Sequence, residues 1–309
     1  MKNHLKNVIS SLPSKLFFAL SSRNLLNWMP DKPYLSALWQ AHFHQAYPWK
    51  NPRSFNEKLQ WLKANDHNPL YPTLVDKYAV RSYIADKIGE QYLIPLVGGP
   101  WNSFDEIDFA QLPEQFVLKC THDSGGVVIC HGKDSFDRKS AREKIEKSLK
   151  RNYYWGGREW PYRDIQPRII AEAFMADDSG NSLVDYKFYM FGGTARCILV
   201  CTNRSAKSKM NMTFFTPDWN RLPFERQYRN DPNELVKPEH FDEMLSLAEQ
   251  LSANLPFARI DLYEINRKVY FGEITLHPAS GLGKFDPVEW DYTLGEWLDL
   301  ERYFPGKFV

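Results

Sequence analysis

Two acidic residues lie where the sequence predicts metal-ion chemistry. Asp261 and Glu273 fall in the segment FARIDLYEINRKVYFGEITLHP, residues 257–278. Apolar and polar residues alternate on both sides of a polar turn at residues 266–268, which is typical of an antiparallel hairpin. A turn centred on Arg267 places the two acids directly opposite each other, and a turn one residue earlier makes them diagonal neighbours on the same face. Like charges so placed repel, whereas Mg²⁺, which binds one or two carboxylates, makes the arrangement favourable.

The alternative for this hairpin is a solvent-exposed face with ordinary surface acids. In both registers Phe257, Tyr263 and Phe271 share the face of the acids. Three large aromatic side chains on that face argue against full exposure to water.

A lysine and a glycine-containing loop suggest a phosphate site. The segment FVLKCTHDSGGVVIC, residues 116–130, places Lys119 in an apolar strand, followed by the loop from Asp123 to Gly126 and a second strand. An ammonium group and the backbone N–H groups of a Gly-Gly loop can both contact phosphate oxygens. The alternative is a surface lysine on an edge strand.

The roles of four further charged residues depend on the groups that face them. Glu172 lies inside the apolar strand IIAEAFM, where an unpaired carboxylate is costly, so we expect a ribose hydroxyl or a protein arginine as its donor. Lys187, two residues after Asp185, predicts either a phosphate contact or a cross-strand ion pair. Lys77 and Arg81 lie four residues apart on one helix face.

Short strands and helices must position these groups. Ser54 and Glu57 form a capping-box pattern that predicts a helix start. Predicted helices cover residues 76–88, 140–151, 238–255 and 291–300. Predicted strands cover residues 92–97, 115–121, 127–131, 168–175, 183–191, 194–202 and 212–216, besides the hairpin above. The pattern indicates an α+β fold with two antiparallel sheets that separate near residue 176. We expect a helical region at 1–75, a first lobe at 76–176 and a second lobe at 177–309.

Composition excludes several classes of protein. The 309 residues include 39 Lys and Arg against 38 Asp and Glu, so the basic excess of a nucleic-acid-binding protein is missing and we expect no nucleic-acid partner. No GxSxG, GxGxxG, HExxH or P-loop pattern occurs. The four cysteines have no zinc-like spacing and predict buried free thiols, which is consistent with the cytoplasm.

Membrane association is a separate question. No run of about 20 apolar residues occurs, so no membrane-spanning helix is expected. Lys2, Lys6 and Lys15 near Leu16 and Phe18 predict either peripheral contact with a membrane surface or a packed helix, and we prefer the packed helix.

Taken in order, these pieces resemble a known family. SFNEKLQWLK, DKYAVRSYI, FVLKCTHDSGG, DYKFYMFGG and FGEITLHPASG are similar to the TupA-like (teichuronopeptide biosynthesis) ATP-grasp family of bacterial capsule, O-antigen and cell-wall polysaccharide gene clusters. The resemblance covers roughly residues 50 to 300 and implies the ATP-grasp fold, in which two antiparallel-sheet lobes hold ATP. Each motif alone is weak, but five in the same order are specific.

The resemblance also implies roles for individual residues. ATP would be bound by Lys77, Lys119, Asp123, Ser124, Gly125, Gly126, Glu172, Ala173, Phe174, Met175 and Lys187. Mg²⁺ would be bound by Asp261, Glu273 and Thr275, the catalytic residues would be Arg259 and Lys187, and His277 and Ser280 would contact substrate. Thr275 replaces the Asn that is usual in the superfamily, which puts a second metal position in doubt.

The implied reaction joins a carboxylate to an amine. The γ-phosphoryl group of ATP passes to a carboxylate, and an amine attacks the acyl phosphate to give an amide. The acid would be a uronic acid or an amino acid, and Trp155, Trp160 and Tyr162 were considered for sugar contact. The helical residues 1–75 replace the βαβ-type domain that precedes many ATP-grasp cores, so no acceptor residues can be transferred. Alternatives are a glycosyltransferase that uses a nucleotide sugar, a kinase, and a non-catalytic nucleotide-binding module; the sequence does not indicate an oligomeric state.

Overall fold

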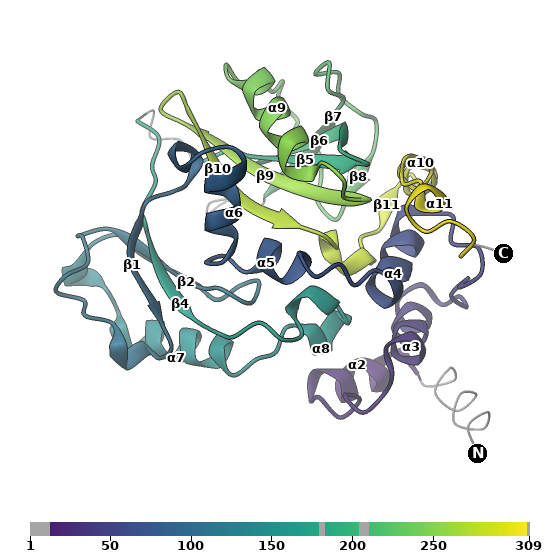
Figure 1. Cartoon of the computed structure of the whole chain (residues 1–309), viewed down its shortest axis with the longest axis horizontal. Coiled ribbons are helices and arrows are strands. Elements are labelled where there is room, and N and C mark those ends of the chain that lie inside the picture. Colours follow the sequence, from purple (N-terminus) through teal and green to yellow (C-terminus); the bar gives the residue numbers. More distant parts are fainter. Residues whose placement is uncertain (1–12, 179–182, 204–209, 308–309) are drawn as a thin grey trace.

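Two antiparallel sheets face each other across helices α5 and α6, and a group of helices lies at one end of the pair (Figure 1). The computed structural model describes residues 13–178, 183–203 and 210–307. The α+β class and the pair of antiparallel sheets, with the change of sheet between residues 173 and 185, agree with the sequence prediction.

The first sheet has four strands in the order β1-β4-β2-β3. Its strands are β1 (Leu96–Trp101), β2 (Phe116–Cys120), β3 (Val127–Cys130) and β4 (Ile169–Ala173). Helix α7 (Arg138–Leu149) packs on one face through Ala141 and Ile145, against Phe116 and Leu118. The other face is therefore left to line the space between the sheets.

The second sheet has five strands in the order β10-β9-β5-β6-β7. Its strands are β5 (Asp185–Phe191), β6 (Thr194–Thr202), β7 (Asn211–Phe215), β9 (Phe257–Ile265) and β10 (Lys268–Thr275), and a separate pair is formed by β8 (Glu225–Arg226) and β11 (Phe285–Asp286). Gly192 and Gly193, both at positive φ, connect β5 and β6 as predicted.

The described helices other than α7 pack at different places, and only some of them cover the second sheet. They are α2 (Ser14–Ser22), α3 (Asp31–Phe43), α4 (Phe55–Asn65), α5 (Tyr71–Val75), α6 (Val80–Lys87), α8 (Tyr154–Gly157), α9 (Phe241–Ser252), α10 (Glu289–Trp297) and α11 (Leu300–Tyr303). Helix α9 packs on one face, and α4 and α10 pack against part of the other. Helix α4 begins with the predicted capping box, in which Ser54 and Glu57 exchange hydrogen bonds.

Alternation along β5 separates the core from the charged groups. Tyr186, Phe188 and Met190 belong to the core under α9. Asp185 and Lys187 point to the opposite face because successive strand residues face opposite sides, and both line the space between the sheets.

The β9–β10 hairpin differs in detail from the prediction. Its turn is the two-residue pair Asn266–Arg267, both at positive φ, and Lys268 pairs with Ile265. Continued along the strands, that register would not pair Asp261 with Glu273. A β-bulge at Gly272 shifts the register by one residue, and the two acids are therefore paired directly. The same bulge turns Phe271 into the core, so the prediction that Phe271 shares the acids' face was wrong.

Two predicted boundaries were also wrong. Residues 92–97 were predicted as a strand, yet β1 begins only at Leu96, after Pro95, which cannot donate to a ladder. The helix predicted from Asp76 begins at Val80, because the Asp76 carboxylate accepts hydrogen bonds from the N–H groups of Tyr78 and Ala79 and holds them in a turn.

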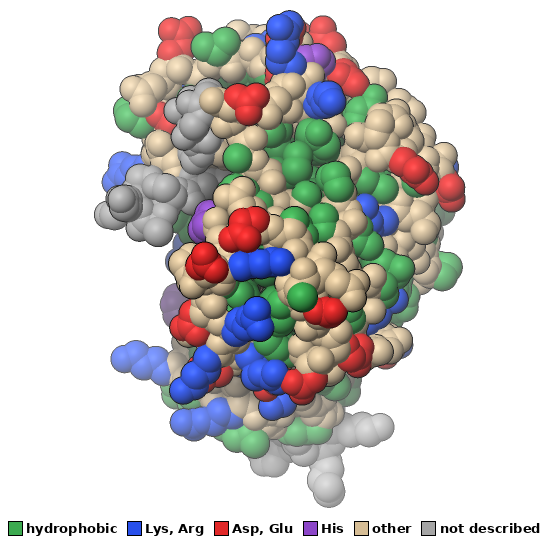
Figure 2. All heavy atoms as spheres, turned by 90° about the vertical axis from the view of Figure 1, so that its left-hand side faces the viewer, with side chains coloured by type: hydrophobic (Ala, Val, Ile, Leu, Met, Phe, Trp, Pro, Cys, Tyr) green, Lys and Arg blue, Asp and Glu red, His purple; other side chains and the backbone are tan. Residues whose placement is uncertain are grey.

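The distribution of surface charge and the state of the cysteines agree with the expectations from composition. On the face shown in Figure 2, Lys, Arg, Asp and Glu side chains are interspersed, as the net charge of +1 suggests. All four cysteines are buried free thiols. Within the described ranges, the helices are all too short or too polar to traverse a bilayer.

We predict that Gly272→Ala destabilises the protein and disturbs the pairing of the acids. An added Cβ would lie 2.8 Å from the Tyr263 ring and 3.0 Å from the Asp261 carbonyl oxygen. Overpacking of this kind costs about 1–3 kcal/mol in the free energy of unfolding, which urea denaturation measures. Gly156→Ala is the control, because its Cβ would meet nothing within 4 Å. Equal stability of the two variants would contradict this role for Gly272.

Candidate active site between the two sheets

Three adjoining cavities form one cleft between the sheets. The first, about 370 Å³, shares Ile94, Lys119, Glu172 and Tyr263 with the second, about 290 Å³. The second shares five lining residues with the third, about 250 Å³: Lys77, Val80, Ser124, Gly272 and Glu273. Because the first and third have no lining residue in common, the cavities follow one another in this order.

The first cavity is largely apolar. Its walls are supplied by both sheets and by the segment that joins them, with Val117, Ile129, Phe174, Met175 and Ile265 among them. Ala173, at the end of β4, also lines it. The structure thus brings Ala173, Phe174 and Met175 together at one apolar slot, whose shape suits a flat aromatic ring.

The second cavity brings cations from four elements together. Lys119 comes from β2, Lys187 from β5, Arg81 from α6 and Lys77 from the turn before α6. Lys77 donates from its Nζ to the backbone carbonyl of Asp123, so it also ties this turn to the β2–β3 loop. A polyanion in this cavity would meet positive charge on several sides.

Glu172 is the counter-ion of these cations on the first sheet. It is 7% exposed, and its carboxylate accepts a hydrogen bond from Lys119 Nζ, with Arg81 Nη1 3.5 Å away. The donor that the sequence required is therefore a lysine on the neighbouring strand. Arg81 was noted only as a helix charge, because no sequence signal shows what its helix faces.

The β2–β3 loop divides into two anchors and two exposed residues. Asp123 is buried and accepts hydrogen bonds from the Ser148 hydroxyl and from the Gly126 N–H. Ser124 and Gly125 are exposed and line the second cavity. Of the four predicted loop residues, these two are thus free to contact a ligand in the second cavity, while Asp123 and Gly126 hold the loop to α7.

Asp261 and Glu273 share their positive partners. Arg259 donates to Asp261 through Nε and Nη2, each at 2.7 Å, and to Glu273 Oε1 at 3.0 Å. Lys187 bonds to Asp261 and also lies 2.6 Å from Asp185 Oδ2. The repulsion between the paired acids is thereby offset by two cations of the chain.

The pKa values of the two acids are driven apart. Burial raises the pKa of Asp261 to about 6, although Arg259 and Lys187 act to lower it. Burial acts on Glu273 in the same direction, but Arg259, Lys187 and Lys77 outweigh it and lower the pKa to about 2. The Glu273 side chain is 46% exposed, so water partly screens these charge effects. Burial acts to lower the pKa of Lys187, but Asp261 and Asp185 raise it overall, so its ammonium stays charged.

The donor set around the acids suits a hard cation. Thr275 Oγ1 lies 3.4 Å from Glu273 Oε1 and accepts from Arg259 Nη2 at 2.9 Å. Two carboxylates and a hydroxyl offer the oxygen ligands that Mg²⁺ prefers. Asp261, Glu273 and Thr275 therefore fit the ion, with Arg259 and Lys187 as the cations that now balance the acids.

The third cavity contains the predicted substrate residues His277 and Ser280. Beside them lie Tyr153, Glu159 and Tyr162, from the segment between α7 and β4. Glu159 and Tyr153 were not predicted, since that segment has no periodic pattern. Trp155 and Trp160, considered for sugar contact, lie elsewhere: Trp160 stacks on His67, and Trp155 contacts the Arg158 guanidinium.

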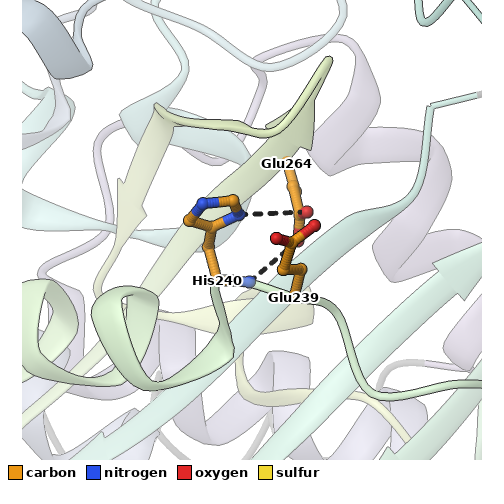
Figure 3. Close-up of side chains that lie close together, drawn as sticks. All are labelled: Glu239, His240 and Glu264. Atoms are coloured by element: carbon orange, nitrogen blue, oxygen red, sulfur yellow. Dashed lines mark hydrogen bonds and ion pairs between the residues drawn. The ribbon is translucent and has the colours of Figure 1, made fainter.

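A second group of potential metal ligands lies near the start of α9. Glu239, His240 and Glu264 have ligand atoms within 4.8 Å of one another (Figure 3). His240 Nδ1 is 3.2 Å from Glu264 Oε1, and Glu239 bonds to Arg267 Nη2 at 2.7 Å. Their charges are partnered within the protein, which accounts for the group without a metal.

A family model described as TupA-like ATP-grasp matches residues 57–299. Among solved structures, the chain is similar to D-alanine–D-alanine ligase from Helicobacter pylori (15% identity, TM-score 0.41, covering 87% of this chain and 68% of that one). It is also similar to the L-amino acid ligase from Bacillus licheniformis (14%, TM-score 0.47, covering 83% and 57%). A third is D-alanine–D-alanine ligase from Bacillus anthracis complexed with ATP (16%, TM-score 0.42, covering 80% and 69%).

The chain spans less than three fifths of the L-amino acid ligase. No curated protein sequence matches the chain.

We predict that Lys119→Ala weakens the binding of ATP by about 10- to 100-fold, because a hydrogen bond to a charged group contributes about 1.5–3 kcal/mol. Isothermal titration calorimetry with a non-hydrolysable ATP analogue measures the effect. Lys139→Ala, which removes an exposed lysine from α7, should bind as the unchanged protein does. Unchanged affinity of Lys119→Ala would remove Lys119 from the phosphate site.

Proposed function

The chain belongs to the TupA-like ATP-grasp family, and from that premise we propose that it is an ATP- and Mg²⁺-dependent ligase that joins a carboxylate to an amine. The order of the three cavities along the cleft is the observation that supports this proposal. An apolar slot, a cation-lined space and a polar chamber beside two acids follow one another in a single cleft. This order suits adenine, the phosphates and an acceptor.

The nucleotide would be held by both sheets. Phe174, Met175 and the backbone near Ala173 would contact adenine, and the Glu172 carboxylate would accept a hydrogen bond from a ribose hydroxyl. Lys77 and Lys119, with Ser124, Gly125 and Lys187, would contact the phosphates, whereas Asp123 and Gly126 would fix the loop. Asp261 and Glu273, with Thr275, would bind Mg²⁺, which neutralises phosphate charge when bound.

The residues around the acids suit phosphoryl transfer to a carboxylate. Lys187 would hold the γ-phosphoryl group, and Arg259, which lines the third cavity and bonds to both acids, would stabilise the charge on the transferring group. The carboxylate oxygen forms a bond to phosphorus as the bond to ADP breaks. The acyl carbon then bonds to the amine nitrogen, and phosphate leaves with the electron pair of the broken C–O bond.

We propose a uronic acid or an amino acid as the acid, and a role in the assembly of a bacterial capsule or O-antigen polysaccharide. The family is named for teichuronopeptide synthesis, which supports a sugar acid. His277 and Ser280 would contact the acceptor. A cytoplasmic location is consistent with a need for ATP and with four free thiols. A nucleotide-sugar glycosyltransferase or a non-catalytic module would not need both an acid and an amine.

We predict that the protein releases ADP only when ATP, Mg²⁺, an acid and an amine are all present. A panel of uronic and amino acids against amino acids, amino alcohols and amino sugars, followed by a coupled ADP assay and mass spectrometry of the amide, tests this. Glu273→Gln should abolish turnover because it removes an anionic ligand of the ion. Glu264→Gln, in the group of Figure 3, should retain it.

Other outcomes select the alternatives. ADP release with an alcohol alone would identify a kinase. Turnover of a nucleotide sugar without ATP would identify a glycosyltransferase. Full activity of Glu273→Gln with loss in Glu264→Gln would move the metal site to the start of α9.

We also propose that the first helices contact an anionic membrane. Helix α2 is packed through Phe17, as expected of a packed helix, but Leu16, Phe18, Leu25 and Trp28 remain 41% to 63% exposed. The first 30 residues contain four Lys or Arg and no Asp or Glu. Apolar side chains beside positive charge favour an anionic lipid surface. Lys2 and Lys6, part of that expectation, lie outside the described residues.

We predict that the protein co-sediments with vesicles that contain phosphatidylglycerol, and less with purely zwitterionic vesicles. Leu25→Ser with Trp28→Ser should weaken this association roughly tenfold or more, because burial of a large apolar side chain contributes about 1.5–3 kcal/mol. Val236→Ser is the control, since Val236 is 85% exposed and distant in sequence. Binding that is indifferent to lipid charge and to the double substitution would contradict the proposal.

A further inference from the structure

The third cavity continues the cleft beyond the paired acids. It holds about 250 Å³ and meets the second cavity along Lys77, Ser124 and Glu273. Arg259 and Thr275 line it from the sheet side. A molecule in this chamber would therefore lie next to the site that we assign to phosphoryl transfer.

The far wall of the chamber is built by two segments outside both sheets. Tyr153 and Tyr162 come from the segment between α7 and β4, and their rings are 4.8 Å apart. Burial raises the pKa of both, so they present neutral phenols. Ala279 and Ser280, after β10, are at φ 52° and 53°. Two successive left-handed residues without glycine are strained, and such strain is characteristic of binding sites.

A buried acid lines this wall. Glu159 is 5% exposed, and burial raises its pKa, although Lys63 and a hydrogen bond from Ser280 act to lower it. A buried carboxylate is costly unless ligands or protein groups contact it. Its position in the chamber wall makes that contact available to a bound molecule.

Glu159 is held in place from helix α4. Lys63, which is 0% exposed, donates from Nζ to the Ser280 carbonyl at 2.7 Å and to Ser280 Oγ at 2.8 Å. Ser280 in turn contacts Glu159. Gly157, two residues before Glu159, is also packed closely against Ser280, because a Cβ at this position would lie 2.3 Å from Ser280 Oγ. Lys63 and Ser280 are thus positioning residues for Glu159.

A ring nitrogen beside the acid has no hydrogen-bond partner among the described residues. His277 Nδ1 is buried without a hydrogen bond and lies 3.8 Å from Glu159 Oε2. His277 is 6% exposed and lines the same chamber. Orphaned polar atoms inside proteins call for an explanation, and a ligand that hydrogen-bonds at this point supplies one.

We propose that this chamber binds the amine substrate as a primary ammonium, with Glu159 as its anionic contact and first proton acceptor. This assignment rests on the proposed ligase activity and extends it to the class of the nucleophile. The chamber is lined by charges of both signs: Arg259 bonds to the paired acids and Lys77 is shared with the second cavity, whereas Glu159 lies beside His277 and Ser280, which do not line the second cavity. A carboxylate suits the surroundings of Arg259 and Lys77, and an ammonium suits those of Glu159.

This placement accounts for both protons that the ammonium loses during amide formation. The ammonium gives one proton to the Glu159 carboxylate and becomes a neutral amine. The nitrogen lone pair then forms the C–N bond to the acyl carbon as the C–O bond to phosphate breaks. The second nitrogen proton leaves with phosphate as hydrogen phosphate.

Hydroxylamine separates this step from phosphoryl transfer. It is small and uncharged at neutral pH, so it traps an acyl phosphate as a hydroxamate without an anionic contact. With the acid that the panel of acids and amines identifies, Glu159→Gln should form hydroxamate at a rate within about threefold of the unchanged protein. Its KM for the amine should rise about tenfold or more, with little change in the KM for ATP.

Several results would decide against the assignment. Equal loss of hydroxamate and amide in Glu159→Gln would show a merely structural role, and an unchanged KM for the amine would show none. Failure of the unchanged protein to form any hydroxamate would contradict the ligase activity itself, on which this assignment depends.

Further variants guard against misfolding. Glu159→Asp keeps the charge and should recover part of the amide activity, whereas Glu264→Gln should behave as the unchanged protein. Lys63→Met should raise the KM for the amine without loss of hydroxamate formation, and Lys63→Arg should restore it in part. Thermal unfolding curves identify any variant whose loss reflects instability.

Discussion

The pairing of Asp261 with Glu273 on neighbouring strands constrains the rest of the cleft. Two carboxylates at one cross-strand position repel, and Asp261 is 1% exposed, where an unbalanced charge is costly. Arg259 bridges both acids, and Lys187 bonds to Asp261 from the next strand. Four charged groups on three strands therefore depend on one another. A change of register there would leave a buried charge without its partner.

Gly272 is the local device that makes this pairing possible. A two-residue turn at Asn266–Arg267 gives a register in which Asp261 and Glu273 miss each other, and the bulge restores it. The sequence predicted that both acids share one face, with direct pairing as one of two possible registers, because alternation marked both strands. It placed Phe271 on the wrong face because period-two reasoning has no signal for an inserted residue, beyond a glycine whose close approach to Tyr263 only the structure displays.

The sheets and the cation–acid set were accessible from the sequence because they lie on strands with regular alternation. Lys119, Glu172, Lys187 and Asp261 each interrupt an apolar run, and such interruptions are visible in a single sequence. Lys63 and Glu159 were not accessible. They come from a helix and an irregular segment far apart in the chain, and only tertiary packing brings both to Ser280.

Helix α4 connects the helical region to the chemistry of the cleft. Its start is fixed by Asn56, which donates to Asp291 of α10, and its last turn carries Lys63 to the loop after β10. The family match begins at residue 57, inside this helix, so most of α4 lies within the matched region and the helices before it lie outside that region. A helix at this place can supply part of the wall of the proposed substrate chamber, since such a wall requires buried charge held at fixed positions. Lys63, Ser280 and Glu159 meet that requirement through the hydrogen bonds from Lys63 to Ser280 and the charge attraction between Lys63 and Glu159.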